Sequence, residues 1–350
     1  MNSLTIALAG LGGVVLAGVV AHGAWQARKA GPRRPEAPPL ESREPVLDTA
    51  QAEPRTEPAS PEEAEAPPLP MSLPRRMPQR IDALIDAIGT LTLDAPVSGE
   101  MVLAHQPPTR RAGSKPFLIE GLNAETGEWE APLPGQHYSE LQAGVQLANR
   151  TGALNEIEYS EFVQKIEPFA EAIGAMADFP DMLDAAARAR ELDAFASQCD
   201  AQLAVHLQAR SAAWSVGYIQ QHAARHGFVP GMVPGRLVLP STEEGAPPVL
   251  TLTFDSQAAL ADDPNRAAVR DVTLSFDVPQ TAAEAEPFSA WQASAQALSL
   301  GMDAVIVDDN GQPLSPAGFA SIGGELGKLY EALETRDIAA GSMVARRLFS

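Results

Sequence analysis

The sequence predicts an α+β protein in which an antiparallel sheet carries helices on one face. Three observations lead to this class. An uncharged apolar run comes first, a proline-rich charged segment follows it, and the C-terminal half mixes short alternating strands with a few amphipathic helices. These parts predict a single N-terminal transmembrane helix, a disordered linker and a folded portion with a split β-α-β arrangement.

The predicted membrane anchor is the run of 19 uncharged residues at positions 3–21. A helix of this length rises about 28 Å, close to the roughly 30 Å hydrocarbon core of a bilayer. No Lys or Arg precedes the run, whereas Arg28 and Lys29 follow it, so the positive-inside rule predicts that the N-terminus lies outside and the bulk of the chain in the cytoplasm. The alternative, a cleaved signal peptide, requires basic residues before the run. The residues expected in the bilayer or at its interface are Leu4, Ile6, Leu8, Leu11, Val14, Val15, Leu16, Val19, Val20 and Trp25.

Small residues recur at every fourth position of the same run. Ala9, Gly13, Ala17 and Ala21 would lie on one helix face and allow two anchors to approach closely. Self-association through the anchor is one interpretation. The other is that Ala and Gly are simply common in membrane helices.

Residues 30–78 form the predicted linker. Proline occupies 13 of these 49 positions, charged residues are frequent, and large apolar residues are sparse. Such a segment cannot bury enough apolar surface to offset the entropy of ordering it. We therefore expect an extended spacer that keeps the folded part near the membrane without fixing its orientation.

Composition excludes several function classes. The net charge of −20 argues against a nucleic-acid partner, because phosphate binding needs clustered Lys and Arg. Cys199 is the only cysteine, so no intramolecular disulfide can form. His222 and His226 have the i, i+4 spacing of a metal site, but the catalytic Glu of a zincin motif is missing between them. We expect no cofactor and no metal.

The C-terminal half has the clearest pattern. Alternating apolar residues predict strands, three- and four-residue spacing predicts helices, and Ser215, Ser315 and Gly227 supply caps. The predicted strands are 202–208, 236–239, 249–254, 271–278 and 304–307, and the predicted helices are 215–226, 286–302 and 315–333. Trp291, Leu298, Phe319 and Leu329 are expected to pack on the inner side of the sheet.

The segment before this half is also predicted to fold. Its expected strands are 81–93, 117–122, 127–130 and 139–148, and its expected helices are 156–176 and 181–195. A strand, a polar turn and a long helix follow one another here as they do at 270–302, which indicates either a diverged copy of the C-terminal module or an extension with its own core. The predicted divisions are 1–29 (anchor), 30–78 (linker), 79–197 and 198–335 (modules), and 336–350 (C-terminal tail).

Several short motifs follow one another in a characteristic order. They are His22-Gly23-x-Trp25-x-x-Arg28-Lys29, Val272-Thr273-Leu274, Val278-Pro279, Ser294-Ala295-Gln296, Val305-x-Val307-Asp308-Asp309 and Leu314-Ser315-Pro316. Together with the anchor and linker, this order resembles the ZipA family of bacterial cell-division proteins. The resemblance implies a non-enzymatic protein of the division septum. Such a protein binds the C-terminal tail of the tubulin-like GTPase FtsZ and ties the FtsZ ring to the inner membrane. The resemblance thus implies a single-pass protein of the inner membrane with a periplasmic N-terminus and a cytoplasmic bulk.

In this family the tail peptide lies on the sheet face away from the helices. The matching positions here are expected to be exposed, and they are small or polar where the resemblance implies an apolar groove. They are His206, Gln208, Thr251, Thr253, Thr273, Ser275 and Asp277. Met232 is expected to supply apolar contact at the edge of this face. Two alternatives remain: an anchored adaptor for another peptide, and an anchored hydrolase whose acidic site combines Asp308, Asp309 and a histidine.

Overall fold

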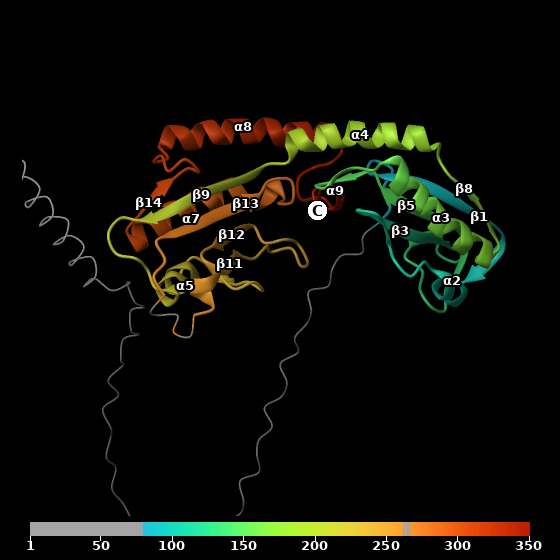
Figure 1. Ribbon diagram of the computed structural model, residues 1–350, viewed down its shortest axis with the longest axis horizontal. Coiled ribbons are helices and arrows are strands. Elements are labelled where there is room, and N and C mark those ends of the chain that lie inside the picture. The colour runs from blue at the N-terminus through green and yellow to red at the C-terminus, as the bar shows by residue number, and fades with distance from the viewer. Residues whose placement is uncertain (1–79, 262, 264–266) are drawn as a thin grey trace, which may run out of the picture.

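The protein forms two α+β modules with antiparallel sheets, which confirms the α+β class and the antiparallel pairing of the prediction (Figure 1). The computed structural model describes residues 80–261, 263 and 267–350. No helix within these residues is both long enough and apolar enough to cross a membrane. The expected anchor, its self-associating face and the linker lie outside the described residues.

The N-module comprises residues 80–199. Its strands are β1 (Asp86–Ser98), β2 (Arg111–Ala112), β3 (Lys115–Asn123), β4 (Trp129–Glu130), β5 (His137–Gln146), β6 (Ala148–Asn149), β7 (Gly152–Ala153) and β8 (Ala175–Asp178). Its helices are α2 (Gly99–His105), α3 (Glu156–Ile173) and α4 (Met182–Cys199). The main sheet has the order β2-β3-β5-β1-β8, with β4 paired to β3.

The C-module comprises residues 200–350. Its strands are β9 (Gln202–Ala209), β10 (Val229–Pro230), β11 (Arg236–Leu239), β12 (Leu250–Thr253), β13 (Asp271–Asp277) and β14 (Ala304–Val307), in the sheet order β10-β11-β12-β13-β9-β14. Its helices are α5 (Val216–Ala224), α6 (Ser256–Ala259), α7 (Pro287–Met302), α8 (Pro316–Thr335) and α9 (Met343–Leu348), with a 3₁₀ turn at Ala283–Ala285.

The two sheets share one strand order. In each, the first long strand (β1 or β9) lies between the strand that precedes the long helix (β5 or β13) and the short strand that follows it (β8 or β14). The next strands outward, β3 and β12, also correspond. The modules therefore repeat a β-α-β-β-α-β-α core, and residues in one sheet can be matched to residues in the other.

Local signals explain where the long helices begin and end. Asn155 and Glu158 form a capping box at the start of α3, and Gly174, at φ 71°, ends that helix. The predicted helix 156–176 was therefore wrong at its last residues, because Ala175 already begins β8. Ser315 caps α8 and Pro316 is its first residue, as predicted.

Helices cover the inner side of the C-module sheet. Trp291, Leu298 and Phe319 are at most 3% exposed and share a core with Leu252 and Leu274. The indole N–H of Trp291 donates a 2.9 Å hydrogen bond to the Leu274 carbonyl. Leu329 packs against this core while partly buried, so the predicted inner positions are confirmed.

The C-terminal segment returns to the N-module. Residues 336–350, predicted as a tail, contain α9, and its Leu348 and the following Phe349 lie in the N-module core. Arg347 forms a buried ion pair with Asp86 at the start of β1, with an Nη2–Oδ1 distance of 2.6 Å. Arg347 also donates to the Arg80 carbonyl at 2.6 Å. Arg347, near the C-terminal end, thus holds Arg80 and Asp86 at the start of the described residues.

A second junction joins the modules along their helices. Figure 1 shows α4 and α8 end to end above the two sheets. The Arg336 guanidinium, just after α8, lies 4.4 Å from the centre of the Phe195 ring on α4 and 3.7 Å from the Glu191 carboxylate. Leu326 of α8 packs in the C-module core and Leu333 in the N-module core. Helix α8 therefore connects both cores.

We expect Arg347→Met to lower the free energy of unfolding by about 3–5 kcal/mol, because it leaves the Asp86 carboxylate buried without its partner. Arg190→Met is the matched control, since Arg190 pairs with Glu156 at the surface and such a pair contributes about 0–1 kcal/mol. Urea denaturation of both variants measures the difference. Equal losses would contradict the role given to Arg347.

Candidate functional site

The candidate site is the outer face of the C-module sheet, the face opposite Trp291 and the other core side chains. Strand pairing arranges its side chains in rows across the strands. One row contains Arg236, Thr253, Thr273, His206 and Val307. The next contains Val238, Thr251, Ser275 and Ala204, and a third contains Asp277 and Gln202.

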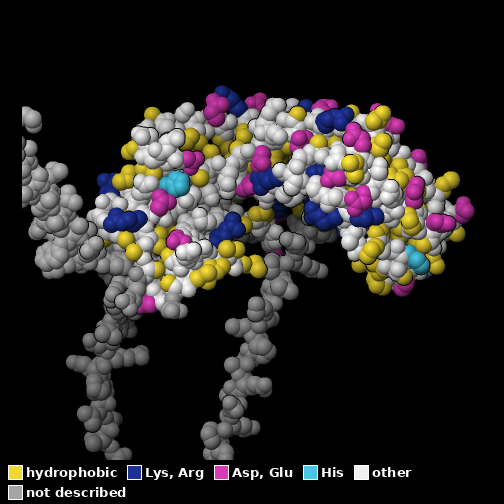
Figure 2. Space-filling model, viewed as in Figure 1, with side chains coloured by type: hydrophobic (Ala, Val, Ile, Leu, Met, Phe, Trp, Pro, Cys, Tyr) yellow, Lys and Arg dark blue, Asp and Glu magenta, His cyan; other side chains and the backbone are white. Residues whose placement is uncertain are grey.

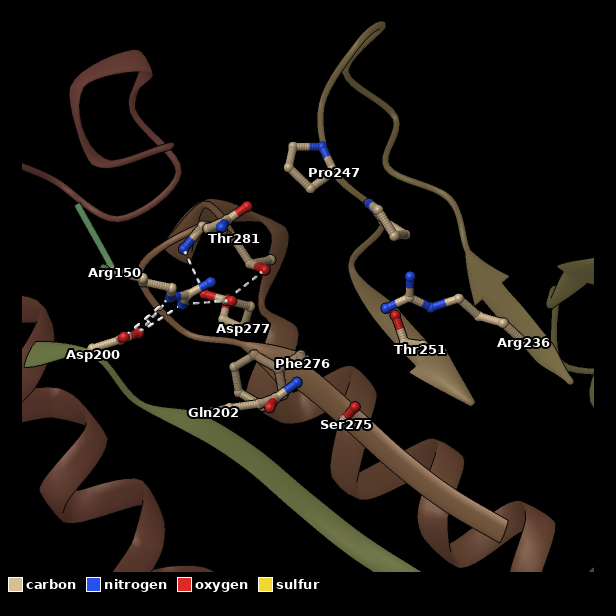
Figure 3. Close-up of a pocket in the computed structure, with 12 residues that line it drawn as sticks. Arg150, Asp200, Gln202, Arg236, Pro247, Thr251, Ser275, Phe276, Asp277 and Thr281 are labelled. Carbon is tan, nitrogen blue, oxygen red and sulfur yellow. Dashed lines mark hydrogen bonds and ion pairs between the residues drawn. The ribbon is translucent and has the colours of Figure 1, made fainter. Parts of the chain in front are cut away.

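A cavity of about 610 Å³ opens over this face where it meets the N-module (Figure 3). Thr251, Ser275 and Asp277, three of the predicted partner-binding residues, line it. Its remaining lining residues are Arg150, Asp200, Gln202, Arg236, Pro247, Pro248, Phe276, Gln280 and Thr281. The cavity is thus bounded by both modules.

At one end of the cavity Arg150 holds two carboxylates. Its Nε and Nη2 donate to Asp200, with distances of 3.0 Å (Nε–Oδ2) and 2.6 Å (Nη2–Oδ1). Nη2 also donates to Asp277 Oδ2 at 2.7 Å. Burial raises the pKa of the Asp277 carboxyl, and the Arg150 contact offsets only part of that effect. Two acids and one base leave this end with an excess of negative charge.

The other end carries Arg236 and the Pro247–Pro248 segment. Arg236 leaves β11 on the outer face, and Figure 3 shows its guanidinium beside Thr251. It is exposed, and among the described residues no hydrogen bond or ion pair of its side chain is present. The cavity therefore has a negative end at Asp200 and Asp277 and a positive end at Arg236.

His206 lies further along the same face, between two acids. Its Nδ1 is 3.0 Å from Asp271 Oδ1 and its Nε2 is 3.3 Å from Asp309 Oδ1. The hydrogen bond to Asp271 raises the His206 pKa most, Asp309 adds to it, and burial opposes it. The arrangement thus favours an imidazolium that donates from both nitrogens.

This geometry bears on the hydrolase alternative. Thr273 Oγ1 lies 3.3 Å from His206 Nδ1, and the same nitrogen lies 3.0 Å from Asp271 Oδ1, so the carboxylate is the nearer partner of that nitrogen. Asp308 accepts backbone hydrogen bonds from Asn310 and Gln312 and so shapes the turn after β14. Asp309 alone of that acidic pair reaches the histidine. No group of three or more His, Cys, Asp or Glu suited to a metal ion occurs within the described parts of the chain.

The strand residues predicted for the partner surface do share the outer face. His206, Thr251, Thr253 and Thr273 are partly exposed there, and Gln208 is exposed. Met232, in the loop before β11, is fully exposed. Ser275 was expected to be exposed and is not: it is 7% exposed, since it lies on the central strand beside Ala204 and Thr251 at the floor of the cavity.

Sequence reasoning identified Asp277 at one end of the cavity but missed Arg150, Asp200, Gln202 and Arg236. Gln202 and Arg236 could have been found, because each alternates with an inward neighbour on a predicted strand. Arg150 could not, because it enters from the other module and no local pattern links it to Asp277.

In comparisons with known proteins, no family model and no curated protein matches this chain. Among solved structures, the chain is weakly similar to the berberine bridge enzyme from Eschscholzia californica, with 11% identity and a TM-score of 0.15. The match covers 75% of this chain and 54% of that chain, so this protein spans about half the length of that enzyme. A similarity at this level carries no argument about fold or function.

We expect His206→Gln to destabilise the protein more at pH 5.5 than at pH 8.5. A histidine pKa raised by folding contributes stability that is fully present below the unfolded-state value of about 6.5 and is lost as the pH rises through the folded-state value. Urea midpoints of variant and wild type at both pH values measure this. His105→Gln, an exposed histidine of α2, gives the background effect. A variant that loses equal stability at both pH values would refute the assignment.

Proposed function

We propose that this chain is a ZipA-like membrane tether that binds the C-terminal tail of FtsZ on the outer face of its C-module. The observation that carries the proposal is the open cavity on that face, in a sheet whose other face is filled by core side chains. An extended peptide can lie across such a face, with side chains entering the cavity.

The positions of the motif residues support this proposal. Val272-Thr273-Leu274 belongs to β13, and Ser294-Ala295-Gln296 lies within α7. Val305 and Val307 belong to β14, the Asp308-Asp309 turn follows it, and Ser315 caps α8. The positions of these C-module motifs agree with the strands, turn and helix start that the resemblance implies, whereas the His22–Lys29 motif lies outside the described residues.

The anchor and linker would give such a module its reach. At about 3.1 Å per residue the linker spans on the order of 150 Å when extended, and roughly 40 Å as a flexible coil. Tethering also raises the concentration of the binding face near the membrane. No orientation of the module is imposed, so a peptide on a moving polymer can be captured from many directions.

The alternative is an anchored adaptor for a different, more polar peptide. The row of Thr253, Thr273 and His206 favours it, because these side chains offer hydrogen bonds where an apolar tail needs contact area. Both functions use the same face, so the identity of the bound peptide distinguishes them.

A titration of fluorescent FtsZ tail peptide against the full chain in detergent tests the proposal. We expect Ser275→Arg to weaken binding at least tenfold, because the new side chain extends into the cavity above the central strand. Thr92→Arg is the matched control, since Thr92 is exposed on β1, on the sheet of the N-module. Thr251→Arg is a second blocking variant at the cavity wall.

Circular dichroism separates blocked binding from unfolding. Leu274→Arg should unfold the C-module, because Leu274 is 0% exposed and the variant buries an unpaired charge. Ser275→Arg and Thr251→Arg should keep the wild-type spectrum. If the folded variants bind the tail as tightly as wild type, the binding site does not lie on this face. If the wild-type chain does not bind the peptide, FtsZ is not the partner.

Membrane topology follows from the predicted anchor. A reporter fused after Ser350 should be active in the cytoplasm, because the basic residues follow the apolar run. Moving Arg28 and Lys29 in front of residue 3 should reduce or invert this orientation. Periplasmic activity of the unaltered fusion would overturn the assignment.

A further inference from the structure

The outer face of the N-module sheet is contacted by Ile81, from the segment that precedes β1. The Ile81 side chain lies over Gly144 on β5, where an added Cβ would be 2.8 Å from Ile81 Cγ2. The Ile81 N–H donates to Glu120 Oε1 at 2.9 Å, and Arg80 Nε lies 3.8 Å from the same oxygen. A segment without regular secondary structure therefore places an aliphatic side chain on this face at Gly144, and Glu120 of the sheet holds its backbone.

The matching position in the C-module can be located by register. Asp86 pairs with Gln146 at the start of β1, and Gln202 pairs with Asp277 at the start of β9. Two residues further along, Ile88 pairs with Gly144, and Ala204 pairs with Ser275. On the next strand Leu118 is opposite Gly144, and Thr251 is opposite Ser275. Ser275 thus corresponds to Gly144, the residue that Ile81 covers.

In the C-module this position is open. Ser275 and Thr251 line the cavity of about 610 Å³, and no described segment takes the place that Ile81 takes in the N-module. The volume is within the roughly 300–1,000 Å³ typical of ligand pockets. The side chains of Thr251, Ser275 and Ala204, which form one row across the strands, are small and leave room for a larger side chain from a partner.

Charge determines which peptide fits. Asp200 and Asp277 share Arg150 at one end, so a carboxylate is repelled there. Arg236 at the other end has a guanidinium that can bind a carboxylate through two hydrogen bonds. Arg236 lies two strands and two residues from Ser275, about 12 Å between Cα atoms at ordinary strand spacings. The long Arg side chain shortens that gap to the length of two or three extended residues.

We propose that the cavity binds an extended acidic peptide segment, with an aliphatic side chain over Ser275 and a carboxylate, two or three residues away, on Arg236. This inference rests on the proposed function for the location of the binding face and adds the chemistry of its ligand. Arg236 is the specificity-determining residue, and Ile81 on Gly144 is the internal example of the aliphatic contact.

The first experiment needs no assumption about FtsZ. Random 12-residue peptides displayed on phage are selected against the full chain in detergent, and again against Arg236→Gln. We expect the wild type to enrich an acidic residue two or three positions from Ile, Leu or Val, and Arg236→Gln to lose the acidic preference while keeping the aliphatic one. Arg190→Gln, on α4 of the N-module, should select as wild type does. No enrichment, or enrichment without the acid, overturns the inference.

The second experiment uses the FtsZ tail peptide and a copy in which each Asp and Glu is replaced by Asn or Gln. Arg236→Gln should weaken binding of the acidic peptide about tenfold or more and leave the neutral copy unchanged. If the tail binds with Ser275 dependence but without Arg236 dependence, the proposed function stands and this inference fails. If the tail does not bind while the selected peptides depend on Arg236, FtsZ is excluded and the inference stands.

Discussion

The buried ion pair between Arg347 and Asp86 is the contact on which the arrangement of the molecule depends. Both side chains are at most 5% exposed, so separating them leaves a charge in the interior, whereas the surface pairs elsewhere are hydrated with or without a partner. The pair fixes α9 against β1 and brings the end of the C-module onto the N-module. With the modules held together, Arg150 reaches Asp277 and completes one wall of the outer-face cavity.

The charge of the whole chain and the charge of the cavity act over different distances. A net charge of −20 repels acidic partners, but salt screens this field beyond about 8 Å under physiological conditions. Figure 2 shows acidic and basic side chains interspersed on the visible face rather than gathered into one field. At contact distance Arg236 dominates its end of the cavity, because Arg150, the other arginine of the lining, is paired with Asp200 and Asp277. Under the proposed binding, the site would select a peptide by local charge complementarity and gain little from long-range steering.

Much of the C-module could be predicted from its sequence. The alternating residues of strands such as β13 and the capping residues of helices such as α8 mark where these elements begin and end. The outward position of His206 and Thr273 followed from that alternation. The rest required the tertiary structure. Helix α9 is too short for a periodic signal and is stabilised by the N-module core. The burial of Ser275 depends on neighbouring strands, and Arg150 meets Asp277 only because the modules pack together.

The place where the chain enters the fold has a mechanical consequence. If the proposed anchor holds the preceding chain at a membrane, tension would arrive at Arg80, whose carbonyl accepts a hydrogen bond from Arg347 and whose neighbour Ile81 donates one to Glu120. A pull in this direction first meets these few hydrogen bonds, and the long strand pairing of β1 and β5 lies behind them. Peeling residues 80–82 from the sheet would lengthen the tether by roughly 10 Å at extended-chain spacing. Under that proposal, residues 80–82 would act as a short extensible segment, because fewer hydrogen bonds hold them than hold β1 to β5.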